Sequence, residues 1–495
     1  MKRVVSCSQM RAADKHTIED LGVPSQELME RAGAAIAEET EKLLSSFGGR
    51  SVLAVCGGGN NGGDGWCAAR LLAEKGFEMA VFTLTDKLSA DCAAQREKYA
   101  GEVFSAFPER KFDVIIDAIF GTGFSRAPEG RFADAIARIN ASGAKVVSAD
   151  IPSGLGGDSG QYVSCVRADV TVTIGELKRG LLLNDGADVC GKVVARDIGI
   201  ELCGAPESWL CEASDFAKLF PPRRKNTNKG SFGTAVILAG SVRYSGAPFL
   251  SAAAALRCGC GYTRLALPAS IFPHAVGKIP EVILTRAPDE DGFLAFDREF
   301  LDGLLGANAI AVGMGSGVTR GLYDSVAYLL TNYKGTLILD ADALNALAEY
   351  GTDILCEKSC RVILTPHPGE FARLFGKTIP EVLADGISLA RFYSCSFGVT
   401  ILLKGHVSII TNGRSVLLNA EGTPALAKGG SGDVLSGIIA SLAARGVNAP
   451  EAAACGAYLL GRAGVLAAEE LGEYSVCATD VVAALPRAIR SLSEK

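Results

Sequence analysis

Short apolar runs alternate with segments of helical periodicity along the first two hundred residues. The runs are rich in valine and isoleucine and lie at 52–56, 80–84, 114–116, 146–149 and 170–174. Such runs are typical of strands buried on both faces, and the helical segments between them supply the crossovers that parallel strands need. The pattern therefore predicts an α/β fold with a Rossmann-like, doubly wound parallel sheet.

A second α/β series follows a break in this pattern. The alternation stops near Ile200, and residues 206–228 are typical of a connection between domains because they contain Pro221-Pro222-Arg223-Arg224-Lys225-Asn226. We therefore expect two domains, residues 1–210 and residues 211–495. Helices are expected at 246–258 and, at the end of the chain, at 451–471. The apolar runs of the second series lie at 234–240, 263–267, 309–312, 336–339, 362–364 and 399–403.

The composition is that of a globular protein with small-molecule ligands. The net charge is −6 and no run of Lys and Arg exceeds residues 223–225, which argues against nucleic-acid or membrane-surface partners. No apolar signal segment and no run of eighteen apolar residues occurs, so we expect a cytoplasmic protein. The 15 cysteines lie mostly in apolar segments and fit buried, reduced thiols. We also expect a homo-oligomer.

Glycines and acids follow the first strands. Residues 57–65 form a glycine loop between a strand and a helix, which presents backbone N–H groups to a phosphate, although the dinucleotide fingerprint G-x-G-x-x-G is matched only loosely. Asp117 and Asp150 follow two later strands. For each acid alone, a turn or capping role is as compatible with the sequence as a role in function. The glycine loop and the two acid-bearing loops lie at one edge of the sheet, however, and three such loops together favour a ligand site.

These motifs resemble the NAD(P)H-hydrate epimerase domain over about residues 1–205, together with Leu28-Met29-Glu30-Arg31-Ala32-Gly33. The resemblance implies inversion at C6 of the hydrated nicotinamide ring, for which Asp150 is the candidate acid/base. Lys178 is a second candidate, with a solvated loop lysine as the alternative. The resemblance also implies a potassium ion held by Asn61, Asp117 and Ser153. It also implies that the hydrate contacts Asn60, Asn61, Gly62, Gly63, Asp64, Gly121, Thr122, Gly123, Phe124, Ser125, Arg126 and Ala127.

The second half contains a glycine turn, residues 427–432, that opens an apolar helix. The backbone N–H groups of Gly430, Ser431 and Gly432 should project from the helix N-terminus toward a phosphate. Asp433 follows directly and could deprotonate a hydroxyl that attacks this phosphate. The alternative is that Asp433 only caps the helix.

Further polar residues follow the other strands of this half. Asp340 and Asp342 end one strand, and His367 and Glu370 follow the next, so that carboxylates could serve a magnesium ion directly or through water. Lys404 offers a cation to a phosphate. No glycine loop ends in Gly-Lys-Ser or Gly-Lys-Thr, which disfavours a P-loop enzyme.

Together these segments resemble the ADP-dependent NAD(P)H-hydrate dehydratase domain over about residues 215–492, which implies a ribokinase-like fold, magnesium and Asp433 as the base. Gly-Ser-Gly-Asp replaces the more common Gly-Thr-Gly-Asp, and residues 313–317 depart from the usual Gly-Pro-Gly. The implied hydrate contacts are Ala247, Gly317, His367, Pro368, Gly369, Glu370, Phe371, Ala372 and Arg373. The implied ADP contacts are Lys404, Gly405, His406, Val407, Ser408, Gly422, Lys428, Gly429, Gly430, Ser431 and Gly432.

The two resemblances together imply a bifunctional repair enzyme. Its substrates are the hydrates NADHX and NADPHX, whose R and S forms the first half interconverts. The second half uses ADP to phosphorylate and then dehydrate the S form, which gives NAD(P)H, AMP and phosphate. The alternative is a ribokinase-like small-molecule kinase fused to a non-catalytic nucleotide-binding module.

Overall fold

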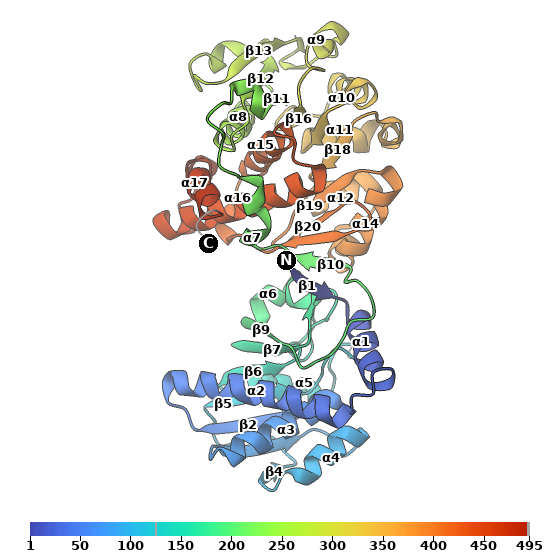
Figure 1. The fold of residues 1–495 in the computed structure, drawn as a ribbon, viewed down its shortest axis with the longest axis vertical. Helices are drawn as coiled ribbons and strands as arrows, with labels where there is room; N and C mark the ends of the chain where they lie inside the picture. The colour runs from blue at the N-terminus through green and yellow to red at the C-terminus, as the bar shows by residue number, and fades with distance from the viewer. Residues whose placement is uncertain (124–125, 493–495) are drawn as a thin grey trace. The chain divides into compact units, whose positions relative to one another are not determined.

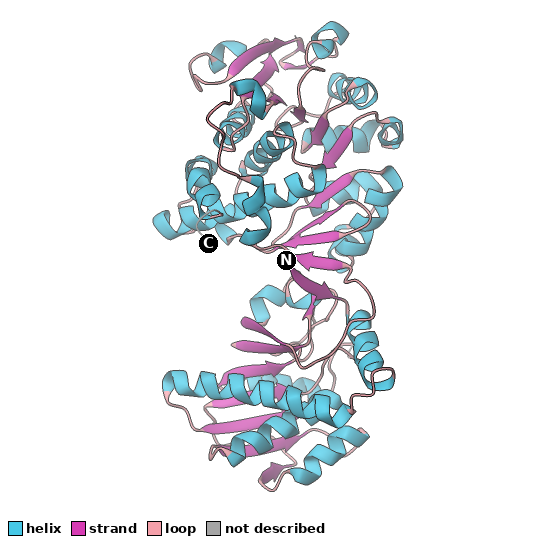
Figure 2. Ribbon diagram, in the orientation of Figure 1, coloured by secondary structure: helices cyan, strands magenta, loops and turns pink. Residues whose placement is uncertain are grey.

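The computed structural model describes residues 1–123 and 126–492. The chain forms two compact units, Lys2–Ser208 and Trp209–Lys495, and Met1 belongs to the second. Both units are layered α/β structures in which helices cover sheets (Figure 1, Figure 2). No helix of the described ranges is both long and apolar enough to cross a membrane.

The first unit is built on a parallel sheet with the strand order β4-β3-β2-β5-β6-β7-β9. From β2 the chain first moves outward to β3 and β4 and then returns to β5 on the other side of β2. This switch point is where doubly wound sheets bind ligands, outside the carboxyl ends of the strands. The strands are β2 (Ser51–Cys56), β3 (Glu78–Thr83), β4 (Glu102–Phe104), β5 (Val114–Ala118), β6 (Lys145–Ala149), β7 (Val170–Ile174) and β9 (Lys192–Arg196).

Helices cover both faces of this sheet, which confirms the doubly wound fold. Val52 and Ala54 of β2 share one core with α2 (Ser25–Phe47) and α3 (Asn60–Glu74), whereas Leu53 and Val55 pack with α5 (Arg131–Ala141) on the other face. The remaining elements are β1 (Lys2–Val5), which pairs with β8 (Leu177–Lys178), α1 (Cys7–Glu19), α4 (Ala90–Lys98), η1 (Arg179–Leu181) and α6 (Gly186–Val189).

The glycine loop after β2 is shorter than the loop at residues 57–65 that the sequence pattern predicted. Helix α3 begins at Asn60, so Gly62, Gly63 and Gly65 lie within its first two turns. A Cβ at Gly62 would lie 2.0 Å from the carbonyl oxygen of Gly57, and one at Gly65 would lie 2.5 Å from Ala118 Cβ. These glycines therefore allow the helix to approach the sheet closely, which is a packing role rather than a turn role.

The second unit contains a larger sheet with the order β13-β12-β11-β16-β17-β18-β19-β20-β21-β10. The strands from β13 to β19 are parallel, and the switch point lies between β11 and β16. The strands are β10 (Ser208–Leu210), β11 (Thr234–Leu238), β12 (Tyr262–Pro268), β13 (Ile283–Ala287), β16 (Ala309–Val312), β17 (Thr336–Leu339), β18 (Arg361–Leu364), β19 (Thr400–Leu403), β20 (Ser408–Thr411) and β21 (Val416–Asn419), with β14 (Asp289–Glu290) and β15 (Phe293–Leu294) as a separate hairpin.

Helices α8 (Ala247–Arg257), α15 (Ser431–Ala444) and α16 (Ala449–Leu471) share a core with alternate residues of the sheet. Helix α17 (Ala478–Ser491) joins this core and was not predicted, so residues 451–471 do not form the last helix. The antiparallel β20 and β21 were also unpredicted. The other helices are α7 (Ala213–Phe216), η2 (Ala217–Leu219), η3 (Lys229–Phe232), η4 (Phe272–Ala275), α9 (Arg298–Asp302), α10 (Arg320–Asn332), α11 (Asp342–Tyr350), η5 (Asp353–Glu357), α12 (Pro368–Phe375), α13 (Ile379–Ala384), α14 (Gly386–Phe397) and η6 (Pro424–Leu426).

Candidate functional site

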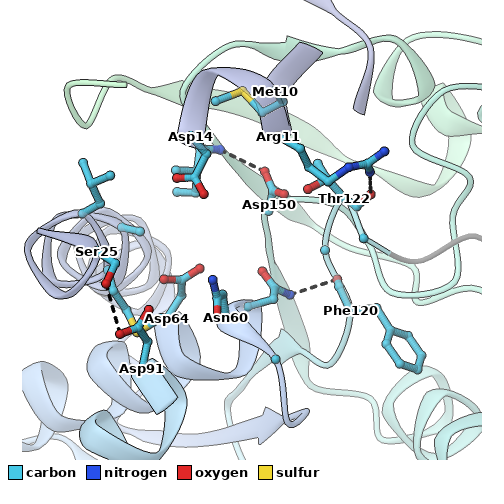
Figure 3. A pocket seen from close by; sticks show the side chains of 18 of the residues that line it. Met10, Arg11, Asp14, Ser25, Asn60, Asp64, Asp91, Phe120, Thr122 and Asp150 are labelled. Carbon is cyan, nitrogen blue, oxygen red and sulfur yellow. Dashed lines mark hydrogen bonds between the residues drawn. The ribbon is translucent and has the colours of Figure 1, made fainter. Parts of the chain in front are cut away.

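The first unit has a cavity of about 630 Å³ at its switch point (Figure 3). Of the predicted hydrate contacts, seven line it: Asn60, Asn61, Asp64, Gly121, Thr122, Gly123 and, as the acid/base, Asp150. Gly62 and Gly63 are buried in the helix packing, and Arg126 and Ala127 are exposed outside the lining. Phe124 and Ser125 lie outside the described residues.

Asp150 is held by a buried lysine. Lys178 Nζ donates to Asp150 Oδ1 over 2.5 Å, to the Ile174 carbonyl over 2.5 Å and to Thr173 Oγ1 over 3.0 Å. The lysine side chain is only 1% exposed, so the solvated-loop alternative for Lys178 is wrong. Asp150 has a left-handed backbone with φ of +67°, a conformation that costs a non-glycine residue about 1–3 kcal/mol and clusters at functional sites.

Two further carboxyl groups point into the same cavity. Asp14 projects from α1 and Asp64 from α3, and both face the space beside Asp150 (Figure 3). Burial raises the pKa of Asp64 well above its usual range, and the charges of Asp150 and Asp14 act in the same direction against a smaller opposing effect of Lys178. Burial, followed by Asp150 and Asp91, also raises the pKa of Asp14. Sequence reasoning missed Asp14, which belongs to no motif.

The predicted potassium ligands converge on the backbone of Phe120. Asn61 Nδ2 donates to the Phe120 carbonyl over 2.9 Å, and the Phe120 N–H donates to Ser153 Oγ over 2.9 Å. Ser153 Oγ in turn donates to Asp117 Oδ1 over 2.5 Å. Burial raises the pKa of Asp117, although four donated hydrogen bonds oppose this. The Asp117 carboxylate, the Ser153 hydroxyl and the Phe120 carbonyl thus lie together beside the Asn61 amide, and oxygen ligands of this kind suit a potassium ion.

In the second unit, a buried acid and a lysine lie beside the first turn of α15. Asp340 is 1% exposed, and its carboxylate accepts hydrogen bonds from Lys404 Nζ over 2.8 Å and from Ser436 Oγ over 2.7 Å. Burial lowers the pKa of Lys404, but Asp340 and then Glu370 more than offset this, so that its pKa is raised. A Cβ at Gly432 would lie 3.6 Å from Lys404 Nζ. The ammonium therefore remains charged next to the predicted phosphate site.

Asp433 lies in the first turn of α15, where backbone N–H groups have no partner within the helix. Gly430 forms the N-cap with φ of +99°, a conformation that glycine adopts easily. Burial raises the pKa of Asp433 to about 7; the negative charges of Asp340 and Asp342 add to this, whereas Lys404 opposes it. A carboxylate with such a pKa can accept a proton near neutral pH, as a general base must.

The loops after β16 and β18 surround this helix end with ordered polar groups. The Gly317 N–H donates to Asp342 Oδ2 over 2.7 Å. His367 is the N-cap of α12: its Nδ1 accepts from the Gly369 N–H over 3.0 Å, and its own N–H donates to Glu370 Oε2 over 2.8 Å. The predicted contacts Pro368 to Arg373 thus belong to the first turns of α12. Burial lowers the pKa of His367, which suits an acceptor nitrogen.

The remaining predicted nucleotide contacts occupy three positions. Gly405, His406 and Val407 form the turn between β19 and β20. Gly422 precedes η6, and Lys428 and Gly429 precede α15. Lys428 Nζ donates to the carbonyls of Tyr474 over 2.6 Å and of Val476 over 2.7 Å, so it is engaged by the segment before α17.

Across the described ranges, no three His, Cys, Asp or Glu side chains are arranged to hold a metal ion. Asp340 and Glu370 contact Lys404, and Asp342 contacts the Gly317 N–H. Magnesium in nucleotide sites is usually held by one or two carboxylates, water and the phosphates rather than by a protein cage. The acids beside α15 fit such a partial site.

Comparison with known proteins places both halves in families. The family described as NAD(P)H-hydrate dehydratase matches residues 235–487, and the family described as YjeF-related protein N-terminus matches residues 25–180. A ribokinase-like superfamily protein from Enterococcus faecalis, 24% identical with a TM-score of 0.50, covers 60% of this chain and is itself covered in full.

Individual relatives match nearly the whole chain. The bifunctional NAD(P)H-hydrate repair enzyme Nnr of Thermofilum pendens is 36% identical over 511 residues, which span 99% of this chain and 97% of that protein. The enzyme of the same name from Moorella thermoacetica is 35% identical, with 99% of this chain and 97% of that protein covered. This chain therefore belongs to the family of bifunctional NAD(P)H-hydrate repair enzymes.

Proposed function

We propose that residues 1–210 interconvert the R and S hydrates of NADH and NADPH, and that residues 211–495 dehydrate the S form at the expense of ADP. The observation that carries the proposal is Asp433, whose pKa of about 7 makes it a base at a helix N-terminus beside the charged Lys404. A base beside an anion site suits the phosphorylation of a hydroxyl.

In the second half, the N-terminal N–H groups of α15 and Lys404 hold the ADP phosphates, and Asp433 removes the proton from the C6 hydroxyl. The hydroxyl oxygen attacks the β-phosphorus, and AMP leaves. The C6–O bond then breaks, phosphate leaves and C5 loses a proton, which restores the C5–C6 double bond. Asp340 or its neighbours, together with the phosphates, would hold a magnesium ion, which would supply charge neutralisation.

In the first half, the Asp150 carboxylate acts as the acid/base for the proton of the C6 hydroxyl. Lys178 holds this carboxylate in position and stabilises its charge. Asn61, Asp117 and Ser153, with the Phe120 carbonyl, would hold a potassium ion that supplies positive charge to the substrate phosphates. The cavity of about 630 Å³ has the size of a small-molecule site.

We also infer that the protein is a cytoplasmic homo-oligomer without nucleic-acid or membrane partners. The net charge of −6 supports the lack of attraction to anionic polymers and lipids.

The test supplies a mixture of R and S hydrates with ADP and magnesium, and follows the recovery of reduced-nucleotide absorbance. Complete recovery with one AMP formed per reduced nucleotide is expected. Consumption of only the S portion would overturn the epimerase assignment. Accumulation of a stable phosphorylated product would instead identify a small-molecule kinase.

A further inference from the structure

Two carboxyl groups in the cavity of the first unit have no partner, in contrast to Asp150. Over residues 1–123 and 126–492, the side chains of Asp14 and Asp64 make no hydrogen bond or ion pair. Both nevertheless point into the cavity, from α1 and α3, while Asp150 enters it from the end of β6 (Figure 3). A desolvated acid without a cation partner is most stable in its neutral form.

We propose that Asp64 is a second catalytic carboxyl of the first half, acting across the cavity from Asp150 on the other face of the hydrated ring, with Asp14 as its positioning residue. This inference rests on the proposed epimerase function and extends it. Asp150 is paired with Lys178, whereas Asp64 has no cation partner and burial raises its pKa, so that the cavity offers two carboxyl groups in different environments, one suited to act as the base and the other as the acid.

Inversion at C6 needs both groups. Asp64 gives its proton to the C6 hydroxyl, the C6–O bond breaks with the electron pair on oxygen, and water leaves. The N1 lone pair forms the N1–C6 double bond of an iminium ion. A water molecule on the opposite face then attacks C6 and gives a proton to Asp150. Asp64 is left ionised and Asp150 protonated, which is the arrangement that the reverse inversion requires, and exchange with solvent resets both.

The surroundings of Asp64 determine how its proton is held. Asp14 of α1 and Asp150 after β6 face it and favour the neutral acid, and Lys178 of β8 opposes them. The thiols of Cys56 in β2 and Cys92 in α4 also lie within its electrostatic reach. Asp91 of α4 acts on Asp14 rather than on Asp64. An asparagine at position 14 cannot ionise, so Asp14→Asn should lower the pKa at which Asp64 releases its proton.

The test compares Asp64→Asn, Asp14→Asn and Glu74→Gln in the full-length chain. Glu74 is the matched control because it is an exposed carboxylate of the same helix as Asp64 and pairs with Arg70 outside the cavity. Purified R hydrate, with ADP and magnesium, reports epimerisation through its conversion to reduced nucleotide. Purified S hydrate reports dehydration alone.

Asp64→Asn is expected to slow R-hydrate conversion at least about a hundredfold, the usual contribution of a positioned acid, with S-hydrate conversion unchanged. Asp14→Asn should move the alkaline limb of the R-hydrate pH profile to lower pH. Thermal melting no lower than that of the wild type would exclude unfolding. An Asp64→Asn rate within threefold of the wild type overturns the role of Asp64, and an unmoved alkaline limb overturns that of Asp14. If the wild type fails to convert R hydrate, the proposed function itself fails.

Discussion

The ammonium group of Lys178 lies 2.5 Å from the Asp150 carboxylate, and the lysine side chain is 1% exposed. A buried charge without its partner is costly, because neither water nor another ion replaces the lost interaction. Lys178→Met should therefore destabilise the first unit by about 3–5 kcal/mol, measured by denaturant unfolding of the full chain. The double variant with Asp150→Asn should recover part of this loss, since both charges are then absent. Equal stability of Lys178→Met and the double variant would contradict the ion pair between Lys178 and Asp150.

Asp433→Asn should separate the two activities. S-hydrate conversion should fall by at least about a hundredfold because the base is lost, whereas the equilibration of R and S hydrates, followed by chromatography, should stay at the wild-type rate. Because the pKa of Asp433 is raised in the folded state, ionisation of this carboxyl lowers the stability of the fold. The loss of stability begins as the pH rises above the pKa of Asp433 in the unfolded chain, and it is complete above about pH 7. Asp433→Asn should therefore melt at a higher temperature than the wild type at pH 8. Retained dehydration would exclude Asp433 as the base.

The pH dependence of dehydration should report the same group. Because the pKa of Asp433 is raised to about 7, the carboxylate is protonated and inactive below that pH. The kcat/KM for the S hydrate should rise with pH, with a limiting slope of one, and level off above about 7. A profile that is already flat between pH 5 and 8 would show that another group controls the step.

The two lysines of the nucleotide site should behave differently. Lys404→Met removes the cation beside α15 and should raise the KM for ADP at least about tenfold. Lys428 is instead bonded to the Tyr474 and Val476 carbonyls, so Lys428→Met should lower thermal stability, with a smaller change in that KM. Initial rates over a range of ADP concentrations, together with melting curves, distinguish the two. The reverse ranking of the KM values would assign the phosphate contact to Lys428.

Ser153→Ala should weaken the dependence of epimerisation on potassium. The Ser153 hydroxyl donates to Asp117 and accepts from the Phe120 N–H, so its loss removes one oxygen and loosens two others. The potassium concentration for half-maximal R-hydrate conversion should rise about tenfold, as for the loss of one interaction worth 1.4 kcal/mol. Tetramethylammonium chloride at equal ionic strength is the control. If the wild-type activity is the same in both salts, the site does not use potassium.

The parallel strands were predictable because runs such as 170–174 and 309–312 consist of β-branched or apolar residues, as is typical of strands buried on both faces. The start of α3 was not, because Gly62 and Gly65 resemble a loop until the neighbouring carbonyl and side chain that exclude a Cβ are known. The hairpin of β20 and β21 was not predicted either, although Asn412-Gly413 between the two strands is a typical hairpin turn and could have indicated it.

Some residues of the candidate sites were likewise predictable from the sequence, and others were not. Asp117 lies near the end of a strand, Asp150 follows one and Asp433 lies in the first turn of a helix, and so the local pattern identifies them. Asp14 is one polar residue on an amphipathic helix, and only tertiary structure turns it toward the cavity. Lys178 could not be distinguished from a surface lysine, because its burial depends on a carboxylate 28 residues away in the chain. The individual roles of these site residues stay predictions until the variants are measured.

The hydroxyl of Ser251 is fully buried between α8 and α15, where it lies 2.8 Å from the Asp433 carbonyl and 3.2 Å from the Ala247 carbonyl. Close by, a Cβ at Gly437 would lie 2.0 Å from the Ser251 carbonyl oxygen, so the two helices touch without an intervening side chain. The end of α8 that is expected to meet the hydrate and the turn that carries Asp433 are consequently held together by direct contact of their backbones and by the Ser251 hydroxyl. Mutations that widen the α8–α15 contact should therefore impair the alignment of Asp433 with the hydrate before they impair binding.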